Sequence, residues 1–308
     1  MKVIGIGNAI VDVLCEVNED FIIKNSLVKG TMKLIDENEL KSLLKSISIK
    51  EVISGGSVAN SIVGLAQLGN KVGFIGKINN DEHGQKYESG LKKEKVDFIF
   101  SKKDELIPTG TCLVFITPDS ERTMCTFLGI AGKIGEADIP HNKVKDAQIA
   151  FLEGYLWDKG DPKKAFDKVI ANAKISAMSL SDTFCVERHK NSFLDLVKNK
   201  LNIIFANESE IMSLIDGKKF EDVLSFSREI KKLMVITRGA KGAMVIKDQE
   251  VIESPAKKNL NIVDLTGAGD LFAAGFLNQY IKGSALDNCL SEGINMSSKV
   301  IQKFGARI

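Results

Sequence analysis

The sequence predicts an α/β protein with a doubly wound, mostly parallel sheet flanked by helices. Short apolar runs alternate with amphipathic stretches of helical length along most of the chain, and this alternation is typical of βαβ units. The composition agrees, because 308 residues with 44% hydrophobic and 27% charged residues are enough to bury such a sheet in one large domain. We therefore expect residues 1–308 to form a single domain.

The individual elements follow from the apolar periodicity. The first apolar run, Val3–Leu14, predicts a strand, and Ser57–Leu68 predicts a helix that ends at Gly69. Further strands are expected at Val72–Ile75, Ile149–Leu152, Ser176–Leu180, Ile203–Phe205, Met234–Thr237 and Ala243–Ile246. Further helices are expected at Asp81–Lys93, Lys163–Ala173, Glu187–Lys198, Phe220–Lys232, Ala268–Ile281 and Leu286–Lys303.

Two regions interrupt the alternation. Cys15–Asp36 and Val96–Phe127 carry β-type segments, such as Phe98–Phe100 and Thr111–Ile116, without crossover helices. Parallel strands need such helices, whereas antiparallel strands do not. We expect these regions to lie outside the main sheet as a small antiparallel β lid, formed by about residues 13–36 and 96–128.

Charge and cysteine content exclude several classes of function. The net charge is +2, from 42 Lys plus Arg against 40 Asp plus Glu, so nucleic acid is not an expected partner. The five cysteines include no Cys-x-x-Cys pair, which argues against a zinc or redox site. The chain carries no recognisable signal peptide and no apolar run of membrane-spanning length. We expect a cytoplasmic protein with no membrane partner.

The strongest local motif is Asp264–Phe272, with the sequence DLTGAGDLF. Its small residues allow a tight turn into a helix, whose free N–H groups form an anion site. A lone Asp at a helix start is ordinarily a stabilising carboxylate. Beside a phosphate site, however, Asp270 would be repelled by the ligand, so we interpret it as a general base.

The usual nucleotide motifs are absent. No Gly-x-x-x-x-Gly-Lys-Ser/Thr sequence occurs, and in Gly5–Ile10 the third glycine of the dinucleotide fingerprint is replaced by Ile10. Gly55–Ala59 nearly fits a nucleophile elbow but ends in alanine. An oxidoreductase or a serine hydrolase is therefore not supported.

Polar residues at strand and helix ends complete the candidate site. Asp12 lies in an apolar strand, where its carboxylate needs either a structural hydrogen bond or the hydroxyls of a sugar diol. We interpret Gly55-Gly56-Ser57 as a tight turn with a capping serine. Asn207–Glu210 is interpreted as a capping segment at the end of a strand, where α/β sheets bind ligands. Thr237–Gly242 is interpreted as a turn.

Together these segments resemble the ribokinase-like PfkB family of carbohydrate kinases, in the family's order along the whole chain. Gly55–Asn60 with Gly76–Gly84 is similar to the first signature region, and Asp264–Asp270 is similar to the second. Asn207–Glu210 matches the family's Asn-x-x-Glu motif. The resemblance implies a doubly wound α/β domain with a small β lid over the acceptor sugar.

The resemblance also implies roles for the matching residues, with ATP as phosphoryl donor and Mg²⁺ as metal. Asp270 corresponds to the catalytic base, and the amides of Gly267, Ala268 and Gly269 correspond to the anion hole. Acceptor-binding residues are expected at Asn8, Asp12, Gly55, Gly56, Asn60 and Arg122. Nucleotide-binding residues are expected at Asn207, Thr237, Gly239, Gly242, Thr266 and Asn295. Glu210 is expected to hold Mg²⁺ through water, and Asp264 and Thr266 match a monovalent cation site that many members fill with K⁺.

Other segments bear on the acceptor. Gly7–Asp12 is similar to the start of adenosine kinases, and four further stretches resemble bacterial members usually called adenosine kinases: Glu121–Met124, Tyr155–Asp158, Ser181–Cys185 and Phe304–Arg307. The implied reaction is ATP + adenosine → ADP + AMP. An apolar lid that contributes Phe115 or Phe127 would suit a purine face, although for either residue alone core packing is the favoured interpretation. Guanosine, inosine, ribose, fructose and 2-keto-3-deoxygluconate remain alternative acceptors, and a non-catalytic nucleoside- or sugar-binding protein is a further alternative. The chain is expected to act as a monomer or homodimer.

Overall fold

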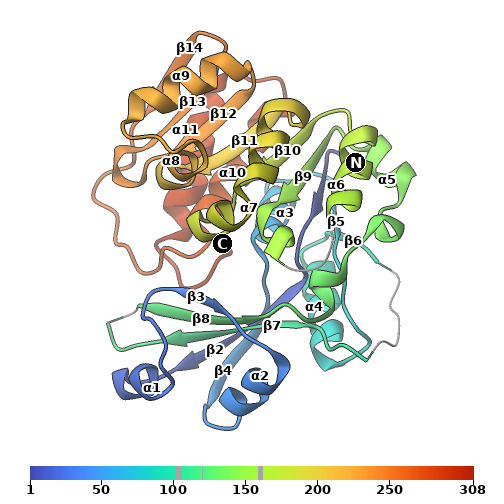
Figure 1. The fold of residues 1–308 in the computed structure, drawn as a ribbon, viewed down its shortest axis with the longest axis vertical. Coiled ribbons are helices and arrows are strands. Elements are labelled where there is room, and N and C mark those ends of the chain that lie inside the picture. The colour runs from blue at the N-terminus through green and yellow to red at the C-terminus, as the bar shows by residue number, and fades with distance from the viewer. Residues whose placement is uncertain (101–105, 120, 159–161) are drawn as a thin grey trace.

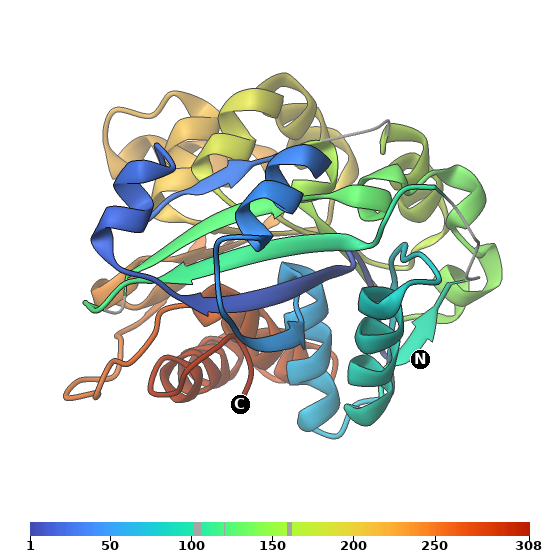
Figure 2. The ribbon, with the colours of Figure 1, turned by 90° about the horizontal axis from the view of Figure 1, so that it is seen from below.

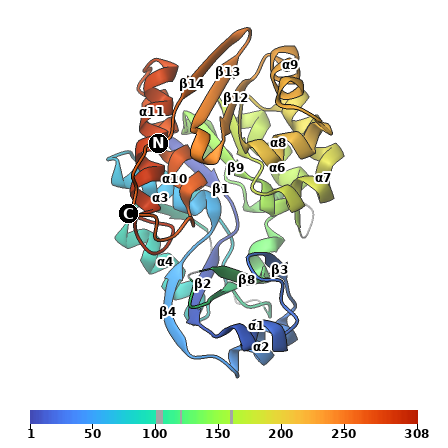
Figure 3. The ribbon, with the colours of Figure 1, turned by 90° about the vertical axis from the view of Figure 1, so that its left-hand side faces the viewer.

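The computed structural model describes residues 1–100, 106–119, 121–158 and 162–308. Two β-sheets organise this part of the chain: a nine-stranded sheet in the body of the molecule and a five-stranded sheet at one end of it (Figures 1 and 3). The predicted α/β fold with a large, mostly parallel sheet is confirmed. None of the helices in the described ranges is both long enough and apolar enough to cross a membrane.

The large sheet has the strand order β14-β13-β12-β11-β10-β9-β1-β5-β6. From β6 to β12 neighbouring strands are parallel, and the hairpin strands β13 and β14 are antiparallel. The strands span β1 (Val3–Ile6), β5 (Val72–Ile75), β6 (Asp97–Ile99), β9 (Ile149–Glu153), β10 (Ser176–Ser179), β11 (Ile203–Asn207), β12 (Leu233–Thr237), β13 (Ala243–Lys247) and β14 (Glu250–Ser254).

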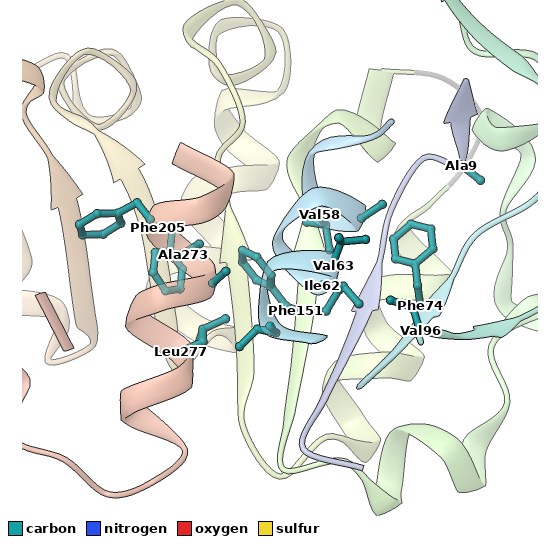
Figure 4. Close-up of a cluster of buried hydrophobic side chains, with 14 of the residues drawn as sticks. Ala9, Val58, Ile62, Val63, Phe74, Val96, Phe151, Phe205, Ala273 and Leu277 are labelled. Carbon is teal, nitrogen blue, oxygen red and sulfur yellow. The ribbon is translucent and has the colours of Figure 1, made fainter. Parts of the chain in front are cut away.

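Helices cover both faces of this sheet (Figure 2). One group is α3 (Ser57–Gln67), α4 (Glu82–Lys93), α10 (Ala268–Tyr280) and α11 (Leu286–Val300). The other includes α5 (His141–Asp146), α6 (Lys163–Asn172), α7 (Thr183–Asp195), α8 (Glu208–Ile215) and α9 (Phe220–Ile230). Because strand side chains alternate between faces, Val3 and Ile4 enter two different core clusters. Figure 4 shows the first cluster, where Val58 and Ile62 of α3 and Ala273 and Leu277 of α10 pack near Phe151.

The predicted strand Val3–Leu14 is wrong as a single element. β1 ends at Ile6, and the chain enters the second sheet as β2 (Ile10–Glu16). Between them, the backbone N–H and Nδ2 of Asn8 donate to the buried Glu153 carboxylate, at 3.2 and 2.9 Å. Gly7 is required beside it, because a Cβ there would lie 2.4 Å from Glu153 Oε2. The apolar run appears continuous because both strands are buried, each in its own sheet.

The small sheet also differs from the predicted antiparallel lid. Its order is β3-β8-β7-β2-β4, with β2–β7 and β3–β8 parallel and β2–β4 and β7–β8 antiparallel. Its other strands are β3 (Met32–Leu34), β4 (Ile49–Ser54), β7 (Gly110–Ile116) and β8 (Arg122–Phe127), and α1 (Glu19–Lys24) and α2 (Glu37–Leu44) pack with it. Only hairpin neighbours must be antiparallel, and β2 and β7 are joined through the large sheet.

The predicted lid boundaries need two further corrections. Phe98 and Ile99 belong to the large sheet, because β6 pairs in parallel with β5, and β4 lies outside both predicted ranges. β4 is mostly exposed and carries Lys50 and Glu51, so it lacks the apolar alternation by which strands are identified. The predicted range 96–128 includes residues 101–105 and 120, which lie outside the described residues.

Candidate active site

A cavity of about 410 Å³ lies between the carboxyl ends of the large-sheet strands and the small sheet. Glu153, Asn207 and Thr237 line it from the ends of β9, β11 and β12. From the other side, the small sheet contributes Ile10, Asp12, Met32, Leu34, Cys112, Met124 and Thr126. The carboxyl edge of a parallel sheet is where α/β proteins bind ligands, so the cavity is the candidate active site.

Asp270 lies in the first turn of α10 and faces this cavity. Its carboxylate accepts hydrogen bonds from Ser57 Oγ, at 2.6 Å, and from Asn60 Nδ2, at 3.0 Å. Burial raises the pKa of Asp270 to about 6, although these two donors and the charge of Arg307 act to lower it. A carboxylate with this pKa is ionised at neutral pH and still basic enough to accept a proton.

The glycine loop that precedes Asp270 builds the start of α10. Gly267 is the N-cap at φ +76°, a left-handed conformation that disfavours other residues, and Gly269 is exposed with open space beside it. The Ala268 N–H donates to the Leu265 carbonyl at 3.2 Å. The first-turn amides of a helix lack intrahelical partners, so this end of α10 suits an anion at the edge of the cavity.

Four of the six predicted acceptor-binding residues line the same cavity as Asp270. Asn8, Asp12, Gly56 and Asn60 all line the cavity. Burial raises the pKa of Asp12 to about 7, against the opposing charges of Arg307 and Arg122. Asn8 Oδ1 is buried and has no hydrogen-bond partner in the described part of the chain. Carboxylate and amide oxygens without full partners are suitable acceptors for sugar hydroxyls.

Gly55 does not line the cavity but lies behind Asp12. A Cβ at this position would fall 2.2 Å from Asp12 Oδ2. Its predicted role in binding the acceptor is therefore indirect in this structure, because its missing side chain leaves room for the Asp12 carboxylate.

Sequence reasoning missed Glu153. It ends β9, is buried, and accepts the N–H of Val58 at 3.0 Å as well as both bonds from Asn8. Burial raises its pKa to about 7. Glu153 thus joins the turn after β1 to the start of α3. The available signal was a polar residue at the end of an apolar strand, which also singled out Asn207.

Asn207 and Glu210 form a reciprocal capping box at the start of α8. Asn207 Oδ1 accepts the Glu210 N–H at 2.8 Å, and the Glu210 carboxylate accepts the Asn207 N–H and Nδ2 at 2.9 and 2.6 Å. Glu210 is buried, which raises its pKa to about 7, and it lines the cavity. No cation pairs with it in the described part of the chain, so a hydrated Mg²⁺ fits this carboxylate.

Three of the six predicted nucleotide residues line a second cavity, of about 810 Å³, which shares Ala268 and Gly269 with the first. These three are Thr237, Gly239 and Gly242, whereas Asn207 and Thr266 line the first cavity, and Thr237 lines both. Gly242 is required by the fold, because a Cβ at its φ of +98° would lie 2.1 Å from the Ser254 carbonyl oxygen. Asn295 lines neither cavity. Its Oδ1 accepts from Lys257 Nζ at 2.6 Å, and Lys257 lines the second cavity.

Arg122 lies outside the first cavity. Its guanidinium pairs with the Asp264 carboxylate and stacks over the Phe304 ring at 4.5 Å. Asp264 Oδ1 also accepts the Thr266 N–H at 2.9 Å, and Oδ2 accepts the Gly305 N–H at 2.7 Å. A carboxylate that already faces a guanidinium and two amide donors does not fit a monovalent cation. The expected K⁺ site at Asp264 and Thr266 is therefore not supported by this donor set.

The small sheet covers the cavity with aliphatic and sulfur-containing side chains. Phe115 is fully buried and packs against Phe21, with ring centroids 4.9 Å apart, and Phe127 is buried in the same core. Neither aromatic residue lines the cavity. From the small sheet, the apolar lining of the cavity includes Met32, Leu34 and Met124 instead, and the large-sheet side adds the aromatic residues Phe151, Phe205 and Phe272.

A model of the family described as pfkB family carbohydrate kinase matches residues 32–308. The chain belongs to the pfkB family. It is therefore a phosphotransferase, and pfkB kinases use ATP, so the predicted family and the predicted enzyme class are confirmed.

Similar proteins include both sugar and adenosine kinases. A probable sugar kinase from Rhizobium etli has 35% identity and a TM-score of 0.94, covering 99% of this pfkB kinase and 94% of that chain. Adenosine kinase from Sinorhizobium meliloti has 33% identity and a TM-score of 0.94, with 100% and 95% covered. Adenosine kinase 2 of Arabidopsis thaliana is 28% identical over 331 residues, with 98% and 94% covered.

The raised pKa values predict how the stability of this pfkB kinase depends on pH. Asp12, Glu153, Glu210 and Asp270 bind protons more tightly in the folded state than in the unfolded state. Their stabilising contribution is present below the unfolded pKa of about 4 and is lost as the pH rises through the folded pKa values of about 6 to 7. Between pH 4.5 and 7.5, wild type should lose free energy of unfolding relative to Asp270→Asn, as measured by urea denaturation. An equal difference at both pH values would contradict the raised pKa of Asp270.

Proposed function

We propose that this pfkB kinase is an adenosine kinase that transfers the γ-phosphoryl group of ATP to the ribose 5′-hydroxyl of adenosine. The observation that carries the proposal is one cavity in which the Asp12 carboxylate, the Asp270 carboxylate and an apolar roof meet. A ribose diol suits Asp12 and Asn8, a purine suits Met32, Leu34 and Met124, and the 5′-hydroxyl then faces Asp270. The similarity to the Sinorhizobium and Arabidopsis adenosine kinases supports the same acceptor.

In this proposal Asp270 takes the proton of the 5′-hydroxyl as the oxygen attacks the γ-phosphorus and the bond to ADP breaks. The amides at the start of α10, at Gly267, Ala268 and Gly269, stabilise the charge on the transferred phosphoryl oxygens. They lie where the two cavities meet, so ATP in the larger cavity would present its γ-phosphate to the acceptor in the smaller one.

In this proposal Glu210 and Asn207 would hold the metal, with the buried carboxylate of Glu210 acting through water. Bound Mg²⁺ would neutralise charge on the ATP phosphates. The small sheet acts as a lid on a single 308-residue domain and keeps bulk water from the γ-phosphate. No step requires K⁺, since Arg122 already supplies a positive charge at Asp264.

The test is ADP release with Mg²⁺ and ATP across a panel of acceptors: adenosine, guanosine, inosine, ribose, fructose and 2-keto-3-deoxygluconate. We expect the highest kcat/KM with adenosine, and a change of less than about twofold when K⁺ is replaced by Na⁺. A free sugar that outperforms adenosine would overturn the acceptor assignment. Strict K⁺ dependence would contradict the conclusion that Arg122 takes the place of a cation at Asp264.

A further inference from the structure

Residues 301–308, which follow α11, lie beside the active site and form hydrogen bonds with the loop before Asp270 and with α3. The Ile301 carbonyl accepts the N–H groups of Val263 and Asp264, at 2.8 and 3.1 Å, at the start of the glycine loop. At the far end, the Ile308 carbonyl accepts from Gln67 Nε2 at 3.1 Å, which places this end of the chain beside α3 (Figure 3). The segment is thereby held between the loop before Asp270 and the helix that carries Asn60.

Arg307 in this segment contacts the acceptor site through Asn60. Its Nε donates to Asn60 Oδ1 at 3.0 Å, and its Nη1 donates to Ser54 Oγ at 2.7 Å, at the end of β4. A guanidinium only donates hydrogen bonds, so it determines which end of the Asn60 amide faces it. Asn60 Nδ2 is consequently directed at Asp270, to which it donates at 3.0 Å. The Asp270 carboxylate, which only accepts when ionised, favours the same orientation, so Arg307 and Asp270 hold the Asn60 amide from its two ends.

Arg307 is separated from the active-site cavity by Asp12 and Asn60. Asp12 and Asn60 line the active-site cavity and also a separate cavity of about 520 Å³ on the other side. Arg307 lines this 520 Å³ cavity and not the active-site cavity, so it does not contact an acceptor bound there. Its Nη2 is buried and has no hydrogen-bond partner among the residues that the structure describes. A buried guanidinium with an unpaired donor lowers the stability of the fold. Its position beside the carboxylates of Asp12 and Asp270 indicates a functional reason for its presence.

The titratable groups that interact with the Arg307 guanidinium lie on several elements of the fold. Arg307 faces Tyr87 on α4, Asp12 on β2, Glu94 after α4 and Asp270 on α10. Its positive charge acts to lower the pKa of Asp12 and of Asp270, against burial, which raises both.

Arg122 also lowers the pKa of Asp12, Asp270 raises the pKa values of Asp12 and Glu153, and the charged residues Glu51, Lys86 and Lys93 line the same cavity as Arg307. Removing the charge of Arg307 should therefore leave more of Asp270 protonated at neutral pH.

Building on the proposed kinase function, we propose that Arg307 is a positioning residue for phosphoryl transfer, which orients Asn60 toward Asp270 and places a positive charge beside the carboxylates of Asp12 and Asp270. Arg307→Met retains most of the side-chain volume and removes the charge and the donors. Arg307→Lys retains the charge but not the planar pair of donors. Lys303→Met, at an exposed position of the same segment, is the matched control.

The first measurement is kcat/KM for adenosine from pH 5 to 9 with saturating Mg²⁺ and ATP. For Arg307→Met we expect a decrease of about 100-fold at pH 7 and an acid limb displaced upward by about one pH unit, with binding of a non-hydrolysable ATP analogue unchanged. Arg307→Lys should restore the position of the acid limb but only part of the rate, and Lys303→Met should match wild type. A purely structural role would lower the melting temperature and total activity without moving the acid limb, and this outcome would overturn the proposal.

A second measurement needs no turnover. A ¹³C NMR titration of the carboxyl groups, with Asp270 assigned by its loss in Asp270→Asn, should show a higher pKa of Asp270 in Arg307→Met than in wild type. If wild type phosphorylates no acceptor, the proposed function fails, and this titration still decides whether Arg307 controls Asp270. An unchanged titration in Arg307→Met, or in Arg307→Gln if the Met variant does not fold, contradicts the role of Arg307.

Discussion

Asp270→Asn is expected to lower kcat by about 10²- to 10⁴-fold while adenosine and ATP still bind. The replacement is isosteric and preserves both hydrogen bonds, because the new amide oxygen accepts from Asn60 and the new amide nitrogen donates to Ser57, whose hydroxyl also accepts. What disappears is the ability to take a proton. For wild type, kcat should rise with pH through about 6 as Asp270 ionises, and the variant should lack this limb.

The assay for this prediction is single-turnover AMP formation, with ligand affinities measured by calorimetry. Asp287→Asn is the matched control, because Asp287 is an exposed acidic residue in the first turn of α11 and lines none of the three cavities described above. If Asp270 only stabilised its helix, the two variants would behave alike. Turnover of Asp270→Asn within about tenfold of wild type would remove Asp270 from the role of base.

Gly267→Ala is expected to have the second largest effect, with kcat reduced by about 100-fold and a lower melting temperature. Gly267 has φ +76°, and a Cβ there would lie 2.7 Å from both Cα and the carbonyl oxygen of Ala306. Both atoms belong to the backbone, so no side chain can move aside. Either the loop or the segment that carries Ala306 must shift, and the first-turn amides of α10 shift with it.

Gly283→Ala is the control that distinguishes the effect of this backbone contact from the effect of backbone strain alone. Gly283 has the same φ of +76° and nothing within 4 Å of the Cβ position, so the substitution costs only the left-handed conformation, about 1–2 kcal/mol. Gly283→Ala should lose stability and keep kcat, whereas Gly267→Ala should lose both. Equal kcat values for the two variants would show that the glycine loop tolerates displacement and that its amides do not act on the phosphoryl group.

Local patterns were enough to predict much of the large sheet. Runs such as Ile203–Phe205 and Met234–Thr237 are apolar because parallel strands are covered on both faces, and β11 and β12 follow them closely. The glycine loop was equally visible, since its small residues, its helix start and Asp270 are adjacent in the chain. The small sheet was predicted poorly, because β4 has its exposed residues in one run rather than in alternation, and because the parallel pairing of β2 with β7 joins residues about a hundred positions apart.

The sequence by itself therefore determined the parallel α/β body, the family resemblance and the residue proposed as catalytic base, because each depends on residues that are neighbours in the chain. Only the tertiary structure decided the surroundings of that base. Ser57 and Asn60 reach Asp270 from more than 200 positions away, and Arg307 reaches Asn60 from a similar distance. Arg122, predicted for the acceptor, is held instead by Asp264. Hydrogen bonds and charge pairs between distant segments depend on the packing of α3, α10 and the small sheet, and no periodicity in the sequence records that packing.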